Sequence, residues 1–423
     1  MPLSDILPPA YSYTSHELNA PGPIEMNART AKEILHDFLF CHAALWVGIL
    51  GYKLVLNPAP PDGDWFVLRE VARSFLAGDW SSIYSDRQLS TGTYYFRYPP
   101  FVLYLIAPLA VLPPMVAYVV VCVTQLTAAA GTLWVLCRIR RPAEMRIVIA
   151  GVFGSAALAH VINSGQNSAL LALVIGVAAY CWSAGRNVLA GACVGLLACK
   201  PNWLPVFGAF VLWRGGLRAG VALALTIASL VLSTLPLGAG VWGDFFAMTA
   251  GASRIAAIYE AYMEITLLAS LKSVLGWTVL AKIVWGGSVA VLTALVIRAI
   301  RDGRPTGRSV ALVTLFAVVA NPYVSFYDGF VLVVPATLWS AHRDEYPGRA
   351  WWIIGGLIAT YWIWDMAIFY YKSVVPVFAE PRVSAAGMIL TAWLLTEALA
   401  RPLSVRPGIN PVPAAAADCS IAR

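Results

Sequence analysis

The stretch PPDGDWFVLREVARSFLAGDWSSIY, residues 60–84, brings acidic and aromatic side chains together directly after an apolar run. Its carboxylates are Asp62, Asp64, Glu70 and Asp79. The prolines and glycine before Asp64 favour a tight connection that holds its carboxylate in place. Such a carboxylate can accept a proton from a hydroxyl group as a general base, or it can only cap the helix that follows. Asp62, between a proline and a glycine, is expected to be a turn residue.

Two cations could act together with this carboxylate. Arg97 lies beside tyrosines in YYFRYPP, Tyr95 among them, and Lys200 lies in ACKPNWLP next to a helix-breaking proline. An ammonium in apolar surroundings is costly and usually functional, although a lysine can also reach the membrane surface by snorkelling. Either cation could neutralise an anionic group such as a phosphate.

Further polar and aromatic residues lie at the junctions between apolar runs. NSGQN supplies Gln166 and Asn167, NPYVSFYDG supplies Tyr327 and Asp328, and Trp65 opens the stretch that follows PPDGD. Amide groups and aromatic rings of this kind supply hydrogen-bond donors and acceptors and flat apolar faces for a polar ligand.

The elements that must position these residues are membrane helices. The chain has 423 residues, of which 59% are hydrophobic and 12% charged, and its mean hydropathy is +0.72. A soluble chain carries about 25% charged residues, so the composition predicts an all-α polytopic membrane protein.

The net charge of +7 falls mostly in short loops, which is a topology signal and does not suggest nucleic acid as a partner. The seven cysteines and five histidines are scattered and no nucleotide-binding loop is present, so we expect free thiols, no histidine metal site and no cofactor.

Apolar runs occur along the whole chain. The first spans about 38–56, and the second extends over 99–137 with a break at Pro113 and Pro114. The others lie at about 147–163, 167–183, 188–200, 202–213, 218–238, 278–300, 309–320, 329–340, 350–371 and 383–400. We expect about twelve crossings, with tilted or broken helices because several runs are short for a full span. The piece 99–114 is expected to re-enter or tilt before the proline pair.

The connections between the runs indicate the orientation. The basic connections fit the cytoplasmic side, with both termini inside; they lie at 138–146, 184–187, 214–218, 298–308 and 342–349. The other connections carry amides, aromatics, prolines and isolated charges, and they lie at 57–98, 163–167, 199–203, 321–329, 371–382 and a long loop at 239–277. This pattern predicts one site on the extracytoplasmic or periplasmic face of an inner (plasma) membrane.

Three regions follow from this pattern. Residues 1–37 are expected to form a disordered cytoplasmic tail, 38–401 the transmembrane domain, and 402–423 a second disordered tail. Within the first outer loop, WFVLREVARSFLAG has apolar residues at helical spacing and predicts an amphipathic helix on the membrane surface, ended by Gly78. On that helix, Glu70 is expected to pair with Arg73 or with solvent.

The order of the motifs resembles glycosyltransferase family 87 of the GT-C membrane superfamily. The family contains the polyprenyl-phosphate-mannose-dependent α-1,2-mannosyltransferases. The resemblance covers roughly residues 38–400 and rests on GDWFVLREVARSFLAGDWSSIY, YPPFVLYLIAPLAVLP, GQNSALLAL, KPNWLPVFGAFVLWR, EITLLASLKSVLG and NPYVSFYDGFVLVVP. Two segments depart from it. Residues 264–267 replace a common Asn-Gln-Ser-Leu, and residues 325–328 lack a histidine that mannosyltransferase members often have.

The resemblance implies a GT-C-like bundle and a donor made of a sugar on a polyprenyl phosphate. The sugar would be a hexose, with mannose first, or a pentose, and the acceptor would be a lipid-linked molecule or a glycan in contact with membrane lipids. A catalytic aspartate is implied at the outer end of the first helix, where Asp64 matches it. Lys200 and Arg97 would then bind the donor phosphate. The residues expected to contact the sugar or the acceptor are Trp65, Tyr95, Gln166, Asn167, Glu264, Tyr327 and Asp328.

Two other interpretations remain open at this point. A secondary transporter or a flippase of a lipid-linked or small polar substrate would explain the many helices, Lys200, and Asp365 in YWIWDMAIF. A lipid-linked glycan polymerase is the other. Transporter folds often contain two related halves. The sequence shows no such repeat, and its polar residues gather on one face, which favours the transferase.

Overall fold

The computed structural model describes residues 33, 36–37, 39–44, 48, 64–85, 87–89, 92–94, 96–259, 264–275, 279–301, 307–346, 348–374 and 385–400. Nearly all of the predicted first tail, the whole of the predicted second tail, most of the predicted first helix, Asp62 and Tyr95 lie outside these residues.

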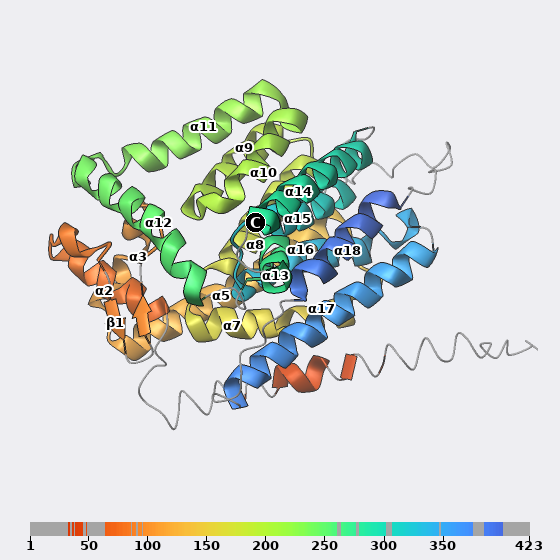
Figure 1. Cartoon of the computed structure of the whole chain (residues 1–423), viewed down its shortest axis with the longest axis horizontal. Helices are drawn as coiled ribbons and strands as arrows, with labels where there is room; N and C mark the ends of the chain where they lie inside the picture. The colour runs from red at the N-terminus through yellow and green to blue at the C-terminus, as the bar shows by residue number, and fades with distance from the viewer. Residues whose placement is uncertain are drawn as a thin grey trace, which may run out of the picture.

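Helices dominate the structure, which confirms the predicted all-α class (Figure 1). In chain order they are α2 (Asp64–Leu76), α3 (Val102–Ile106), α4 (Pro108–Val111), α5 (Pro114–Ile139), α6 (Met145–Phe153), α7 (Ala156–Ser164), α8 (Ser168–Ser183), α9 (Asn187–Gly195), α10 (Leu204–Phe210), α11 (Gly216–Leu232), α12 (Ala239–Tyr259), α13 (Leu267–Leu275), α14 (Val279–Ile300), α15 (Gly307–Ala320), α16 (Val333–Ala341), α17 (Gly348–Val374) and α18 (Ala386–Leu399). Short 3-10 turns join several of them, of which η3 (Leu196–Cys199), η4 (Pro201–Trp203) and η7 (Phe326–Leu332) bear on the site.

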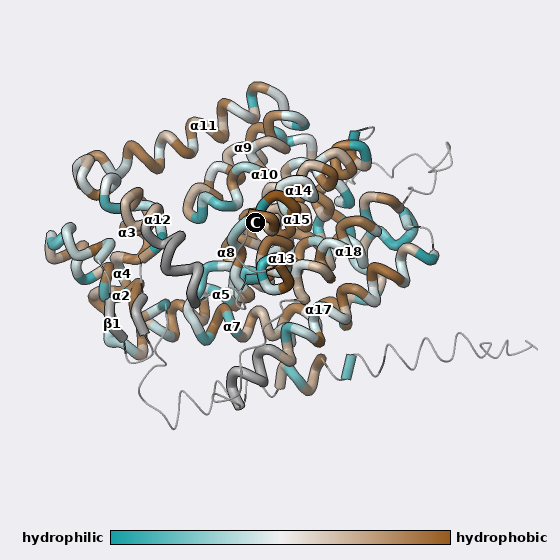
Figure 2. Tube along the Cα trace, in the orientation of Figure 1, coloured by the Kyte–Doolittle hydropathy of each residue, from teal (hydrophilic) through white to brown (hydrophobic). Residues whose placement is uncertain are grey.

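Four helical segments of the described chain are long and apolar enough to cross a membrane: Pro114–Ile139, Met145–Ser164, Pro201–Leu237 and Val279–Ile300. Six shorter apolar segments accompany them: Val102–Val111, Ser168–Ser183, Asn187–Cys199, Gly307–Ala320, Phe326–Ala341 and Ala386–Leu399. Hydrophobic residues dominate α11 and α14, while hydrophilic residues gather near helix ends (Figure 2). The chain is therefore a helical membrane protein, and the count of about twelve crossings stays a prediction.

The predicted break at the proline pair is present. Leu112 is extended, Pro113 precedes the helix and Pro114 is its first residue, so α4 ends and α5 begins there. Proline has no N–H and fits the first turn of a helix, which explains this boundary. The short helices α3 and α4 precede it, as expected for an interrupted piece.

The helix predicted after PPDGD is α2, and Gly78 follows it with a φ of 75°. One polar residue of this helix is buried: Arg69, at 3% exposure, donates to the carbonyl of Leu112 from Nε at 3.2 Å and from a terminal nitrogen at 3.0 Å. It thereby ties α2 to the end of α4. Glu70 pairs with Arg73 at 3.2 Å, as predicted, and also with Arg69 at 3.0 Å. That α2 lies on the membrane surface stays a prediction.

Two features differ from the sequence predictions. The residues 239–277 are not a long loop, because α12 and α13 occupy most of this range. Aromatic residues of α12 pack onto the α2–α3 region, with ring centroids 6.2 Å apart for Trp242 and Phe101 and 5.8 Å apart for Phe245 and Tyr84. These tertiary contacts stabilise a helix that carries no long apolar run. A small antiparallel hairpin, β1 (Arg87–Leu89) and β2 (Gly92–Tyr94), also interrupts the first outer connection.

The core has two main parts. The larger is built around α8 and α15, and every residue of α15 except Phe316 is buried. The smaller joins α2, α3, α4 and α12, which gather at the left of Figure 1. Four of the predicted basic connections meet in two pairs: Arg140 pairs with Asp344 at 2.7 Å, and Arg214 donates to the carbonyl of Arg301 at 3.4 Å. Each pair joins two connections that were predicted to share one face.

Candidate active site

Asp64 opens α2 and is held from a distant part of the chain. The side-chain amide of Gln166 donates a hydrogen bond to its Oδ2. The Oε1 of Gln166 in turn accepts a hydrogen bond of 2.9 Å from the hydroxyl of Tyr98. Gln166 is therefore fixed at both ends, and it orients the carboxylate of Asp64.

A glycine brings these segments together. Gly165 ends α7 with a φ of 72°, a left-handed conformation that favours glycine. A Cβ atom at this position would lie 2.3 Å from the Cβ of Trp65. The close approach of α7 to the first turn of α2 thus needs a residue without a side chain, and it places Gln166 beside Asp64.

Trp65 itself is buried at 1% exposure and packs against Tyr118, with ring centroids 5.5 Å apart. Its indole faces the protein interior. We therefore assign Trp65 to the packing of α2 and not to contact with a sugar.

Lys200 stands between η3 and η4, where Pro201 ends the preceding turn. Its Nζ lies 2.5 Å from the Oδ1 of Asp328 in η7, and the same oxygen accepts a bond of 2.6 Å from the hydroxyl of Ser168. The ammonium also lies over the ring of Tyr327, 5.2 Å from its centroid. The structure thus brings three predicted site residues, Lys200, Tyr327 and Asp328, into contact.

Arg97 reaches a residue of the same region. One of its terminal nitrogens donates to the hydroxyl of Tyr323, and its guanidinium carbon lies 5.7 Å from the centroid of that ring. Arg97 is adjacent to Tyr98, which belongs to the Asp64 network. The two cations and the two carboxylates therefore belong to neighbouring networks.

The environment of Tyr98 supports this grouping. Burial, and then the negative charges of Asp64 and Asp328, raise the pKa of Tyr98 well above its usual value. The hydroxyl stays protonated at neutral pH and serves as the donor to Gln166. Since both carboxylates act on one hydroxyl, both lie near Tyr98 in a single polar region.

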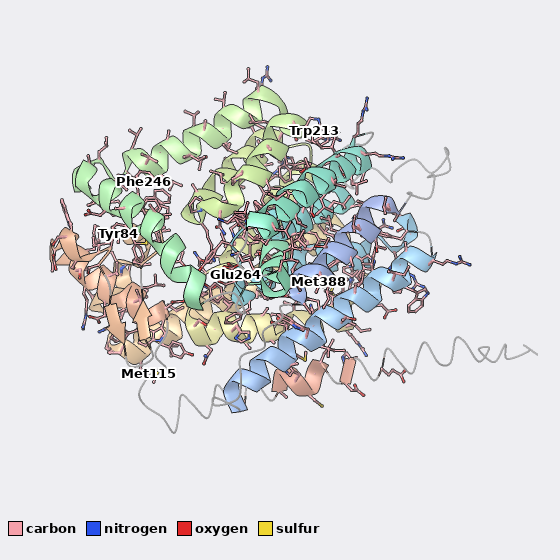
Figure 3. The ribbon with its side chains drawn as sticks, viewed as in Figure 1. Tyr84, Met115, Trp213, Phe246, Glu264 and Met388 are labelled. Carbon is pink, nitrogen blue, oxygen red and sulfur yellow. The ribbon has the colours of Figure 1, made fainter. Side chains whose placement is uncertain are left out.

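Glu264 approaches from the segment before α13, near the middle of the view in Figure 3. It forms a backbone bridge with Ser325, and the N–H of Ile265 donates to the carbonyl of Val324 at 2.9 Å. Glu264 as a whole residue is 2% exposed. Its Oε2 lies 3.8 Å from the Nζ of Lys272. Burial lowers the pKa of Lys272, and the charge of Glu264 opposes this shift. Glu264 therefore borders the segment that carries Asp328, with a cation as its neighbour.

A sequence model of glycosyltransferase family 87 matches residues 96–322, more than half of the chain. The chain belongs to glycosyltransferase family 87. It is a membrane glycosyltransferase, and it acts on a sugar donor and an acceptor. No curated protein and no solved structure gave a match. The transporter interpretation is set aside on this finding.

Within this glycosyltransferase, the matched range contains Arg97, Gln166, Asn167, Lys200 and Glu264. Asp64, Tyr327 and Asp328 lie outside it. Their place in the site is argued from the hydrogen bonds and ion pairs above.

Three contacting residues were not predicted as site residues: Tyr98, Ser168 and Tyr323. Each lies within or next to a motif that was recognised, since Tyr98 is in YYFRYPP, Ser168 follows NSGQN and Tyr323 is in NPYVSFYDG. The motifs indicated the region, but only the packing shows which hydroxyl groups face it. Of the predicted residues, Asn167 follows Gln166 at the start of α8, and its Oδ1 is buried with no hydrogen-bond partner among the described residues.

The described part of the chain contains no group of three or more His, Cys, Asp or Glu side chains that could hold a metal ion. Lys200 and Arg97 are the two predicted cations of the described site, and Lys272 lies beside Glu264 at its border.

Proposed function

We propose that this glycosyltransferase transfers a sugar from a polyprenyl-phosphate donor to a hydroxyl group of a lipid-linked or glycan acceptor. The observation that carries the proposal is the pairing of an oriented carboxylate, Asp64, with two cations, Lys200 and Arg97, in neighbouring hydrogen-bond networks. A sugar on a phosphate already has a leaving group, so the chain must supply a base, a positive site and a place for the sugar.

Asp64 is the general base in this proposal. Its carboxylate takes the proton of the acceptor hydroxyl while the acceptor oxygen forms a bond to the anomeric carbon. The bond between that carbon and the phosphate oxygen breaks, and the electron pair leaves with the phosphate. A single displacement of this kind inverts the configuration at the anomeric carbon.

Lys200 and Arg97 neutralise the charge that develops on the leaving phosphate. An ammonium has three donors, and Asp328 engages Lys200 at 2.5 Å on one side. The Lys200 side chain is 16% exposed, whereas that of Asp328 is 3% exposed. Asp328 therefore holds Lys200 on its buried side, and a ligand can reach the ammonium from the exposed side.

Gln166, Asn167, Tyr327, Asp328 and Glu264 supply the amides, carboxylates and ring that border this region. We propose that they contact the sugar or the acceptor, with mannose as the first hexose to test and a pentose as the next. The site is proposed to face the extracytoplasmic side of an inner membrane, where a polyprenyl chain can remain in the lipid.

The test uses the purified protein in lipid nanodiscs with a panel of polyprenyl-phosphate sugars. Release of polyprenyl phosphate in the presence of an acceptor extract is the expected result, with one sugar strongly preferred. Transfer from nucleotide sugars alone, with no use of any polyprenyl-phosphate sugar, would overturn the donor assignment.

A further inference from the structure

The two cations of the proposed donor site come from segments far apart in the sequence. Arg97 lies just before α3, and Lys200 lies in the turn between η3 and η4. A phosphate group can engage both cations only when their spacing is fixed. Tyr323 forms hydrogen bonds with both segments, to Arg97 through its hydroxyl and to Asn202 through its carbonyl.

Tyr323 is bound at three points. Its hydroxyl accepts a hydrogen bond from Arg97, and its ring lies below the guanidinium. Its carbonyl accepts a bond of 2.8 Å from the side-chain amide of Asn202. Its N–H donates to the Oδ1 of Asn321 at 3.0 Å.

A second bond closes the contact between the two segments. The side-chain amide of Asn321 donates to the carbonyl of Asn202 at 2.9 Å. Asn202 thus forms hydrogen bonds to the segment 321–323 through both its side-chain amide and its backbone carbonyl. A proline precedes Asn202 and another precedes Tyr323, and proline restricts the backbone of both segments. The contact is therefore stiff as well as doubly bonded.

We infer that Tyr323, with Asn202 and Asn321, forms a clamp that sets the position of Arg97 relative to Lys200. The inference rests on the proposed function, in which both cations bind one phosphate. Tyr323 is a positioning residue, because it acts through the two cations and not on the donor. Its hydroxyl directs Arg97, and its backbone anchors the turn that carries Lys200.

The first test is a double-mutant cycle on kcat/KM for the donor. Arg97→Gln should lower kcat/KM by roughly tenfold in the wild-type background, the effect of losing one good contact to a charged group. Tyr323→Phe keeps the ring but removes the hydroxyl, and it should cause a similar loss. In the double variant, the second substitution should lower kcat/KM by less than about a further twofold, because the two residues act as a unit.

Tyr104→Phe provides the matched control for the cycle. Tyr104 is 40% exposed and packs edge-on against Phe75 of α2. Its effect should be small and additive with that of Arg97→Gln. Additive losses for Tyr323→Phe and Arg97→Gln would overturn the positioning role, since a merely structural residue gives no coupling to Arg97.

The second test does not depend on transfer. Hydrogen–deuterium exchange of the full-length protein in nanodiscs follows peptides that cover 196–204 and 321–328. Asn202→Ala and Asn321→Ala should each increase exchange in both segments, since each removes a bond that joins them. Unchanged exchange in the partner segment would overturn the clamp. If the wild-type protein released no polyprenyl phosphate, the donor assignment would be wrong. The exchange result would still show whether the two segments are joined as proposed.

Discussion

The Nζ atom of Lys200 lies 2.5 Å from the Oδ1 of Asp328, so the ammonium predicted to meet a phosphate already has a carboxylate partner. Ser168 donates to the same oxygen at 2.6 Å. Because the carboxylate is the more deeply buried of the two groups, it depends on the pair more than the ammonium does. This relationship changes what substitution of the lysine is expected to do.

Lys200→Met should lower both stability and transfer. From the sequence alone we expect the corresponding Lys200→Ala variant to keep its fold, but the pair predicts that removing the cation leaves a buried carboxylate uncompensated, at a cost of about 3 kcal/mol. Thermal unfolding in detergent and release of polyprenyl phosphate measure the two effects. Lys200→Arg should rescue only part of the transfer, since a guanidinium differs from an ammonium in shape and hydration.

The double variant Lys200→Met with Asp328→Asn is the control for that prediction. It removes both charges, so most of the lost thermal stability should return while transfer stays low. Recovery of normal donor use in the double variant would remove Lys200 from the phosphate site and leave it a structural partner of Asp328.

Asp64→Asn should express and bind donor normally but lose at least about a hundredfold in turnover, because general-base catalysis contributes about 10²–10⁴ in rate. The amide keeps the size of the side chain and can still accept the bond from Gln166. Single-turnover transfer measures the loss. Asp62→Asn is the matched control and should lose far less. Near-normal transfer by Asp64→Asn, with loss in Glu264→Gln, would show that the base was misassigned.

Gln166→Glu should make transfer more sensitive to acid. The change replaces a donor with a carboxyl group at hydrogen-bond distance from Asp64, and two such groups share a proton. A base must be ionised to act. As the pH falls, the Gln166→Glu variant should therefore lose activity at a higher pH than the wild type does. The pH profile of kcat/KM measures this shift. Asn167→Asp adds a carboxylate one position later and should shift the profile less; equal shifts would show that the effect is not specific to the Gln166 contact.

The predicted orientation is tested by cysteine accessibility in a variant without native cysteines. Cysteines at Arg140, Arg218, Arg304 and Arg349 should be protected from an impermeant reagent added outside intact cells. Asp64, Gln166, Lys200 and Asp328 should lie at or near the outer face, and cysteines at the two partly exposed positions, Asp64 and Lys200, should react with the reagent from outside. Labelling of position 304 from the outside would overturn the assignment of the two faces.

The sequence predicts the helical class and much of the site because both depend on local signals. Apolar runs predict α8, α14 and α15 nearly to their ends, and a lysine in apolar surroundings is informative without a structure. The helix α12 was not predicted, because aromatic contacts with Tyr84 and Phe101, which lie between α2 and α3, stabilise it and no long apolar run marks it. The partner of Lys200 could not be predicted either, since a contact between positions 200 and 328 depends on packing.

Gly165 offers a stability test with a matched control elsewhere in the chain. Gly165 and Gly185 have nearly the same conformation, with φ of 72° and 71°. A Cβ at position 165 would lie 2.3 Å from the Cβ of Trp65, whereas one at position 185 would meet nothing within 4 Å. Both substitutions by alanine should therefore cost about 1–2 kcal/mol for the left-handed backbone, and Gly165→Ala should cost a further amount of about 1–3 kcal/mol from the clash.

The two alanine variants should differ in turnover as well. The clash at position 165 pushes the first turn of α2 away from α7, which moves Asp64 relative to Gln166. Transfer measured well below the melting temperature should fall in Gly165→Ala and stay near wild type in Gly185→Ala. Equal turnover in the two variants, despite a difference in melting temperature, would show that the contact between Trp65 and Gly165 stabilises the fold without setting the position of the base.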